Sequence, residues 1–462
     1  WVSTVWDQNF LEVEPLAAKV AQEITQDGPN AFSRLYQALS PFAGKIQENT
    51  ENIGTFFSKN NLSPTTMVAV LHHFVQEGQQ KKADAQQRIC ALHAAGLYFL
   101  LLEVPGTFAS RLFHEVMFEK CLHTLTKCWP QNPDVTRKKK KMPSQSSKTK
   151  AQRGRKKGRP NRIDSEMEEE EEEEDEDREN IYISTNDLVQ IRDSIFLLLK
   201  NFLRLLLKFS LKEKPQCMQS CLKAFVELTN FDAEVQEFEF PAAMDVDKAK
   251  YIPELAYHGL GLLCSPLHGT KDEHVRYVFR PILHIILMVE SSMRPRCAVL
   301  PITSAVLTAR KQAIKFVSFV VDELKEVGFS VLRILLQNMC AKVPDKAEYR
   351  TYAAQALGIL LNKLPNREFA DFIRWLYKYS LNSKSAYRVF AIDAALALLD
   401  VPERNWDHSL SLEHQKFLKH KFLVQIMVFG RCWDKASVVR SKALSSFAQC
   451  LEIKDASILD SM

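Results

Sequence analysis

The sequence predicts an all-α chain whose helices stack in pairs along an extended array. Glycine and proline are scarce, at 14 and 19 residues in 462, which argues against an all-β chain full of tight turns. Apolar residues recur at three- and four-residue spacing, the pattern of amphipathic helices. A short pattern of arginine and alanine also recurs at similar intervals, which is typical of a repeat architecture. A chain of this length exceeds the size at which one hydrophobic core keeps growing.

The ten cysteines indicate an intracellular protein without a metal site. Their spacings are irregular, and the closest pairs, Cys217 with Cys221 and Cys121 with Cys128, lack the two-residue gap and histidine partners of a zinc site. We expect free, mostly buried thiols in a reducing compartment. The most apolar stretches, 94–102 and 194–211, are too short for a bilayer or are interrupted by lysine and arginine, so no membrane partner is expected.

Two charge blocks divide the chain. Residues 137–162 contain thirteen Lys or Arg and no Asp or Glu, and residues 164–179 contain thirteen acidic residues and one Arg. Such segments cannot bury enough apolar surface to offset the entropy of ordering. We therefore predict an amino-terminal helical domain at 1–130, a disordered linker at 131–180, and a repeat array at 181–462.

Before the linker, helical periodicity covers residues 30–39, 64–76, 83–102 and 108–128. Proline marks the predicted stops at Gly28-Pro29, Ser40-Pro41 and Val104-Pro105, because it removes a helix hydrogen bond. After the linker, helical segments alternate with short breaks. Residues 276–288 are rich enough in Val, Ile and Tyr to compete as a strand, but their length favours a helix.

The repeat pattern is an Arg, an Ala three residues later, and an apolar residue or Ala seven residues later. Residues that are three, four and seven positions apart lie on the same face of a helix. An Ala on that face allows close packing against a neighbouring helix. Intervals of 40, 38 and 52 residues separate the last four arginines, and we assign the longest to a unit with an inserted loop at 401–410. The period predicts a HEAT or armadillo-type α-solenoid. The copies are Arg88, Ala91 and Ala95; Arg310, Ala313 and Val317; Arg350, Ala353 and Leu357; Arg388, Ala391 and Ala395; and Arg440, Ala443 and Phe447.

An acidic residue precedes several of these arginines by four to six positions, as Asp84, Asp345 and Asp434. Each lies where a turn enters the helix, so its carboxylate can accept from backbone N–H groups that lack partners. Arg350, Arg388 and Arg440 could line a concave binding surface, but an ion-pair ladder between repeats, formed with the turn aspartates, is the stronger interpretation. An irregular helical domain with chance matches is the alternative to a solenoid.

Four segments, at 92–106, 201–217, 249–269 and 412–424, resemble the D-type HEAT subunits of condensin II. The basic-then-acidic linker lies between the same blocks in those proteins. The resemblance implies the amino-terminal part of a longer, non-catalytic subunit, without cofactor or metal. It also implies as partners a kleisin, an SMC heterodimer with ATPase heads, a second HEAT subunit, and chromatin, both DNA and methylated histone tails. The implied location is the nucleus and mitotic chromosomes.

The basic part of the linker is the first candidate site. Its clusters resemble nuclear-import signals, and Lys157-Gly158-Arg159-Pro160 nearly matches the core with which AT-hooks enter the minor groove. The alternative is a solvated tether masked by the acidic run. We name these residues the linker cations: Lys138, Lys139, Lys140, Lys141, Arg153, Arg155, Lys156, Lys157 and Arg159.

A second candidate, the cation row, is Lys200, Arg204, Lys208 and Lys212. Spacing by four places these residues on one helix face, which could bind a partner or the chain's own acidic run at 168–174. The alternative is the solvated side of an amphipathic helix.

The sequence contains no phosphate-binding glycine loop, nucleophile elbow, HExxH or kinase motif, so catalysis is not predicted. Within scaffolds, a transport receptor of the importin type is the alternative to a condensin subunit.

Overall fold

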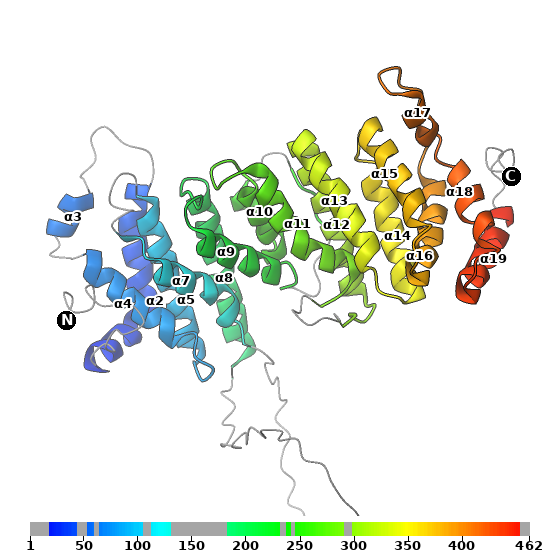
Figure 1. Ribbon diagram of the computed structural model, residues 1–462. Coiled ribbons are helices and arrows are strands. Elements are labelled where there is room, and N and C mark those ends of the chain that lie inside the picture. The colour runs from blue at the N-terminus through cyan, green and yellow to red at the C-terminus, as the bar shows by residue number, and fades with distance from the viewer. Residues whose placement is uncertain are drawn as a thin grey trace, which may run out of the picture.

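The computed structural model describes residues 18–43, 53–59, 64–104, 112–130, 183–231, 237–241, 245–290 and 298–452. In these ranges the chain is an elongated α-solenoid, with the two ends of the array far apart (Figure 1). The only β-type pairing in the described ranges is an isolated antiparallel bridge between Val289 and Val299. The predicted all-α, HEAT-type fold is confirmed.

The helices form two rows. One row contains α4 (Pro64–Glu77), α7 (Glu115–Lys127), α9 (Pro215–Leu228), α11 (Lys271–Leu287), α13 (Glu326–Lys342) and α15 (Asn366–Tyr379). The other contains α5 (Ala85–Glu103), α8 (Thr185–Leu206), α10 (Ile252–Leu263), α12 (Ser304–Leu324), α14 (Ala347–Leu361), α16 (Ser385–Ala397) and α19 (Ser437–Glu452). Helices contact mainly their immediate neighbours, as a solenoid requires.

The remaining elements lie outside these two rows. They are α2 (Ala18–Leu39), α3 (Ile53–Lys59), α17 (Leu412–Leu418) and α18 (Phe422–Met427), with 3₁₀ turns η1 (Ser40–Ala43), η2 (Val246–Lys248), η3 (Leu398–Asp400) and η4 (Phe429–Arg431). The stretch predicted as an inserted loop is non-helical from Val401 and leads into α17, which packs on α15.

The alanines of the repeat pattern are buried between packed helices. The alanines that follow the repeat arginines by three residues, such as Ala313, Ala353 and Ala391, have at most 1% exposed surface. Each lies on a helix of the second row, where consecutive helices approach one another. Small side chains thus set the close spacing along this row, as the sequence predicted.

The regular stacking changes between α10 and α12. Here α10 contacts α11, and an extended segment at 237–241 fills the space beside α12. The ring of Phe240 contacts Tyr257 of α10 and Phe316 of α12, each with centroids 5.7 Å apart. Aromatic side chains from the segment therefore replace part of the direct helix contact.

Two predictions about local structure are wrong. Gly28-Pro29 was expected to stop a helix, yet α2 continues through both residues. Gly28 is buried, and a Cβ there would lie 2.9 Å from the Cys90 sulfur, so close packing of α2 on α5 outweighs the lost hydrogen bond. Asp345 was expected to cap a helix, but its carboxylate accepts from Arg350 instead, at 2.7 Å. By contrast, Asp84 caps α5 as predicted, accepting from the Gln87 amide at 2.8 Å.

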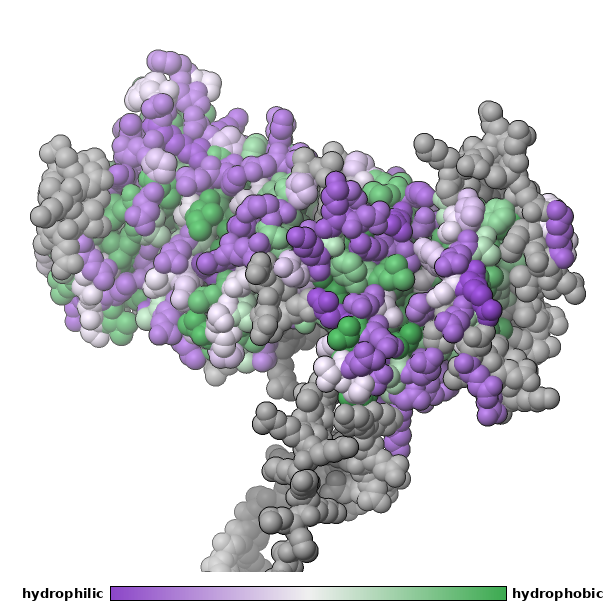
Figure 2. All heavy atoms as spheres, turned by 180° about the vertical axis from the view of Figure 1, so that it is seen from behind, coloured by the Kyte–Doolittle hydropathy of each residue, from purple (hydrophilic) through white to green (hydrophobic). Residues whose placement is uncertain are grey.

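Seen from behind, hydrophilic residues cover much of the surface, and hydrophobic residues are exposed in separate patches along the array (Figure 2). No helix in the described ranges is both long and apolar enough to cross a membrane.

Candidate binding surfaces

The cation row does not lie on a single helix face. Helix α8 ends at Leu206, so Lys200 and Arg204 belong to the helix, whereas Lys208 and Lys212 follow it in a turn. The prediction of one continuous face is therefore wrong. The spacing by four was correct for a helix, but nothing in that spacing reveals where the helix ends.

The two helical members of the row hold a neighbouring segment in place. The Arg204 guanidinium donates to Asp247 Oδ1 at 2.6 Å and to Asn201 Oδ1 at 3.3 Å. Lys200 Nζ donates to the carbonyl of Asp247 at 3.3 Å. Asp247 belongs to η2, so these cations fix η2 against α8.

Lys208 connects elements from both sides of the predicted linker. Its Nζ donates to Glu103 Oε2 at 3.2 Å and to the carbonyl of Ala43 at 2.9 Å. The Glu103 carboxylate is buried, and burial raises its pKa while Lys208 opposes that rise. Nearby, the Tyr36 hydroxyl donates to Asn201 Oδ1 at 2.9 Å. This polar network ties α2, η1 and α5 to α8.

Lys212 is exposed, and no partner is found for its side chain within the described ranges. Partner binding by the cation row stays a proposal, and Lys212 is the residue best placed for it. The linker cations, between residues 138 and 159, all lie outside the described residues.

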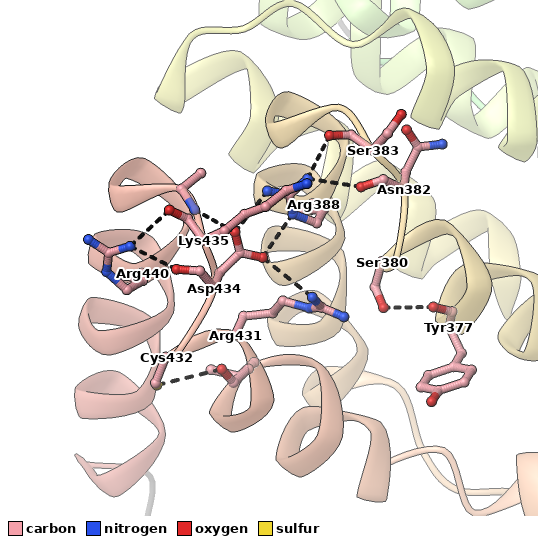
Figure 3. Close-up of polar contacts among 12 residues, drawn as sticks. Tyr377, Ser380, Asn382, Ser383, Arg388, Arg431, Cys432, Asp434, Lys435 and Arg440 are labelled. Carbon is pink, nitrogen blue, oxygen red and sulfur yellow. Dashed lines mark hydrogen bonds and ion pairs between the residues drawn. The ribbon is translucent and has the colours of Figure 1, made fainter.

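The repeat arginines form contacts within the array. Arg388 of α16 is buried and donates to both oxygens of Asp434, at 2.8 Å each, in the turn before α19 (Figure 3). It also donates to the carbonyls of Asn382 and Ser383. Asp434 further accepts from the Ala436 amide at 2.9 Å. These charge-assisted bonds lower the pKa of Asp434 to about 2, with the hydrogen bond from Arg388 as the main cause.

Arg350 makes a similar connection one repeat earlier. Its Nε donates to Asp393 of α16 at 3.0 Å, and Lys442 of α19 reaches the other oxygen of Asp393 at 2.6 Å. Asp393 thus bridges α14, α16 and α19. The predicted ladder with the turn aspartates is confirmed for Arg388, which reaches Asp434 of the next repeat. Arg350 also connects two repeats, but its partner there is Asp393, which lies within a helix and was not identified from the sequence.

The remaining copies satisfy backbone carbonyls. Arg310 donates to the Tyr352 carbonyl of α14, and its guanidinium lies 5.1 Å from the Tyr352 ring centroid. Arg88 donates to the carbonyls of Ala83 at 3.0 Å and Lys127 at 3.1 Å. Arg88, Arg310, Arg350 and Arg388 therefore connect neighbouring helices of the array, whereas Arg440 donates to the carbonyls of Asp434 and Lys435 in the turn before its own helix, at 2.8 and 3.1 Å.

The described array contains cavities that the sequence did not indicate. An apolar cavity of about 470 Å³ lies between α9, α10, α11 and α12, lined by Phe238, Tyr257 and Ile285 among others. A more polar groove of about 560 Å³ crosses α14, α16 and α19, and its lining includes Gln355 of α14 and Asn362, which follows that helix. Neither contains a group of histidine, cysteine or carboxylate side chains able to hold a metal, and none was found elsewhere in the described ranges.

The chain resembles known proteins over its whole length. A family described as condensin-2 complex subunit D3-like, N-terminal domain, matches residues 1–206. The chain is 54% identical over 463 residues to condensin-2 complex subunit D3 of Mus musculus, and 53% identical over 460 residues to condensin-2 complex subunit D3-L of Xenopus laevis. Each comparison covers 100% of this chain and 31% of the relative, so the chain spans about a third of the length of these proteins. With this identity extending through both rows of the solenoid, the chain belongs to the family of condensin-2 complex D3 subunits.

Proposed function

We propose that the chain is part of a non-catalytic scaffold subunit of a condensin-2 complex. The observation that carries the proposal is that more than half of the residues across the whole chain are identical to those of D3 subunits. An extended solenoid suits this role, because it offers long surfaces to other macromolecules without an enclosed active site. The importin-type alternative has no comparable support.

The partners proposed are a kleisin, the ATPase head of an SMC heterodimer, the second HEAT subunit and chromatin, including methylated histone tails. The proposed setting is the nucleus, where the complex acts on mitotic chromosomes. In this role the array binds kleisin and SMC head while the chain itself performs no chemistry.

Co-purification tests this proposal directly. The 462-residue chain would be co-expressed with overlapping kleisin fragments, and separately mixed with a Ran-type GTPase loaded with GTP. We expect one kleisin fragment to elute with the chain in size-exclusion chromatography and the GTPase to elute alone. Binding to the GTPase without binding to any kleisin fragment would favour the transport-receptor alternative.

We also propose that the linker cations supply a DNA contact or a nuclear-import signal. A segment of this charge binds duplex DNA through phosphates, so salt weakens the binding steeply. Replacing Arg153, Arg155, Lys156, Lys157 and Arg159 by Ala removes five positive charges. We expect a shallower slope of log affinity against log salt, measured by fluorescence anisotropy with a labelled duplex. An unchanged slope would remove the linker from DNA binding, and unchanged nuclear accumulation would remove it from import.

A further inference from the structure

A groove between α11 and α13 combines an apolar floor with cationic walls. Its volume is about 280 Å³. Phe279, Leu283, Val331 and Leu335 form the floor and are almost fully buried, and Ile334 is partly exposed. The polar lining residues are Arg276, Arg280, Asn338 and Lys342, all exposed.

The positive charge of this groove is only partly compensated. Arg276 pairs with Asp272 at 3.1 Å, one turn earlier on the same helix. Arg280 and Lys342 have no ion pair or hydrogen-bond partner from their side chains within the described ranges. The pKa of His284 is lowered first by burial and then by Lys342 and Arg280, with no carboxylate opposing them. Two cations without a carboxylate partner in the described ranges therefore line the groove.

Several other cations of the described array are compensated. Arg204, Lys208 and Arg350 each pair with a carboxylate of the chain, and Arg388 is buried with Asp434. In the α11–α13 groove, uncompensated charge instead adjoins a recess that can receive a side chain.

We propose that this groove docks an acidic peptide segment of a partner protein, with an apolar residue on the floor and carboxylates toward Arg276, Arg280 and Lys342. Arg276 and Arg280 are four residues apart, a rise of about 6 Å along a helix. Alternate side chains of an extended peptide repeat at about 6.6 Å, so carboxylates at every second position match this spacing. This occupant goes beyond the proposed function, since it is defined by its chemistry and not as a member of the condensin-2 complex.

The dimensions favour a peptide over duplex DNA. Packed helices have axes about 8–10 Å apart, so the space between them admits side chains but not a double helix. Three cations are also few for a duplex site, whose affinity depends on many phosphate contacts.

The test uses the 462-residue chain and a labelled peptide of alternating Glu and Leu with one central benzoylphenylalanine. The groove variant is Arg280→Gln with Lys342→Gln. The matched control is Lys223→Gln with Lys416→Gln, two exposed lysines on α9 and α17 that carry the same charge change. We expect about tenfold weaker binding for the groove variant in fluorescence anisotropy, and little change for the control. Irradiation of the wild-type complex should give adducts on α11 and α13, located by mass spectrometry.

Three outcomes would overturn the proposal. Equal weakening by both double variants would mean that only net charge matters. Adducts confined to residues 137–162 would place the peptide on the linker. A large gain in peptide affinity on deleting residues 164–179, lost again in the groove variant, would make the chain's own acidic run the occupant rather than a partner. Since none of these measurements involves a kleisin, their failure is separate from failure of the proposed function.

Discussion

At the scale of single residues, the Arg388–Asp434 pair joins two repeats through buried charges. The exposed fraction of these side chains is 4% and 2%, so neither charge is well solvated without the other. Replacing Arg388 by Met leaves the Asp434 carboxylate buried with Arg431 as its remaining cation, at 3.3 Å. We expect a loss of about 3–5 kcal/mol of local stability, measured by urea unfolding followed by circular dichroism. The double variant with Asp434→Asn should recover part of this loss.

An exposed pair provides the control for this prediction. Lys363 and Asp322 are both partly solvated, with 35% and 53% of their side chains exposed. Lys363→Met should therefore cost at most about 1 kcal/mol. Equal losses from Arg388→Met and Lys363→Met would mean that burial does not strengthen the repeat ladder.

The Arg388–Asp434 pair also predicts that the stability of the chain decreases at acidic pH. The pKa of Asp434 is about 2 in the folded chain and about 3.9 when unfolded, so the unfolded state binds the proton more readily. The stabilisation is complete above pH 4 and is lost as pH falls toward 2. We expect about 2 kcal/mol less stability from this group at pH 2 than at pH 6. In Asp434→Asn that part of the pH dependence should disappear from thermal unfolding curves.

At the scale of a helix, two glycines of α10 should respond with opposite signs. A Cβ at Gly259 would lie 2.4 Å from the ring of Phe225, which is fully buried and cannot move aside freely. A Cβ at Gly261 would meet no atom within 4 Å. We expect Gly259→Ala to destabilise the chain by about 1–3 kcal/mol through overpacking. Gly261→Ala should stabilise it by about 0.5–1 kcal/mol, because alanine favours the helix. Urea midpoints that shift in the same direction would contradict this.

Helical elements were largely predictable from the sequence, because their periodicity reflects burial of one face. Residues 64–76 were predicted as a helix and α4 spans Pro64–Glu77. Helix ends were less predictable, since they depend on partners distant in sequence. Pro29 lies inside α2 because of packing on α5, and Lys208 lies beyond α8 in a turn facing Glu103. The groove between α11 and α13 could not be predicted, because its walls come from helices in different repeats.

At the scale of the whole molecule, the array continues across the predicted linker. Helices α5 and α8 pack together although residues 131–180 separate them in sequence. The rings of Phe99 and Phe202 lie 4.8 Å apart at this interface, and the Lys208–Glu103 ion pair lies nearby. The division into 1–130 and 181–462 stays a prediction, and these contacts indicate how the two parts would interact if the linker were cut.

A protease site introduced within residues 137–162 tests this interaction. We expect the two pieces to elute together after cleavage, because the α5–α8 contact buries apolar surface on both sides. Gly96 of α5 faces α8, and a Cβ there would lie 3.8 Å from atoms of Leu198 and Asn201. Gly96→Ala should fit at this distance and keep the cleaved pieces together, whereas the larger side chain of Gly96→Leu should force α5 from α8 and release them. Separation of the cleaved wild-type pieces at micromolar concentration would show that the covalent linker, rather than the packed interface, holds the array together.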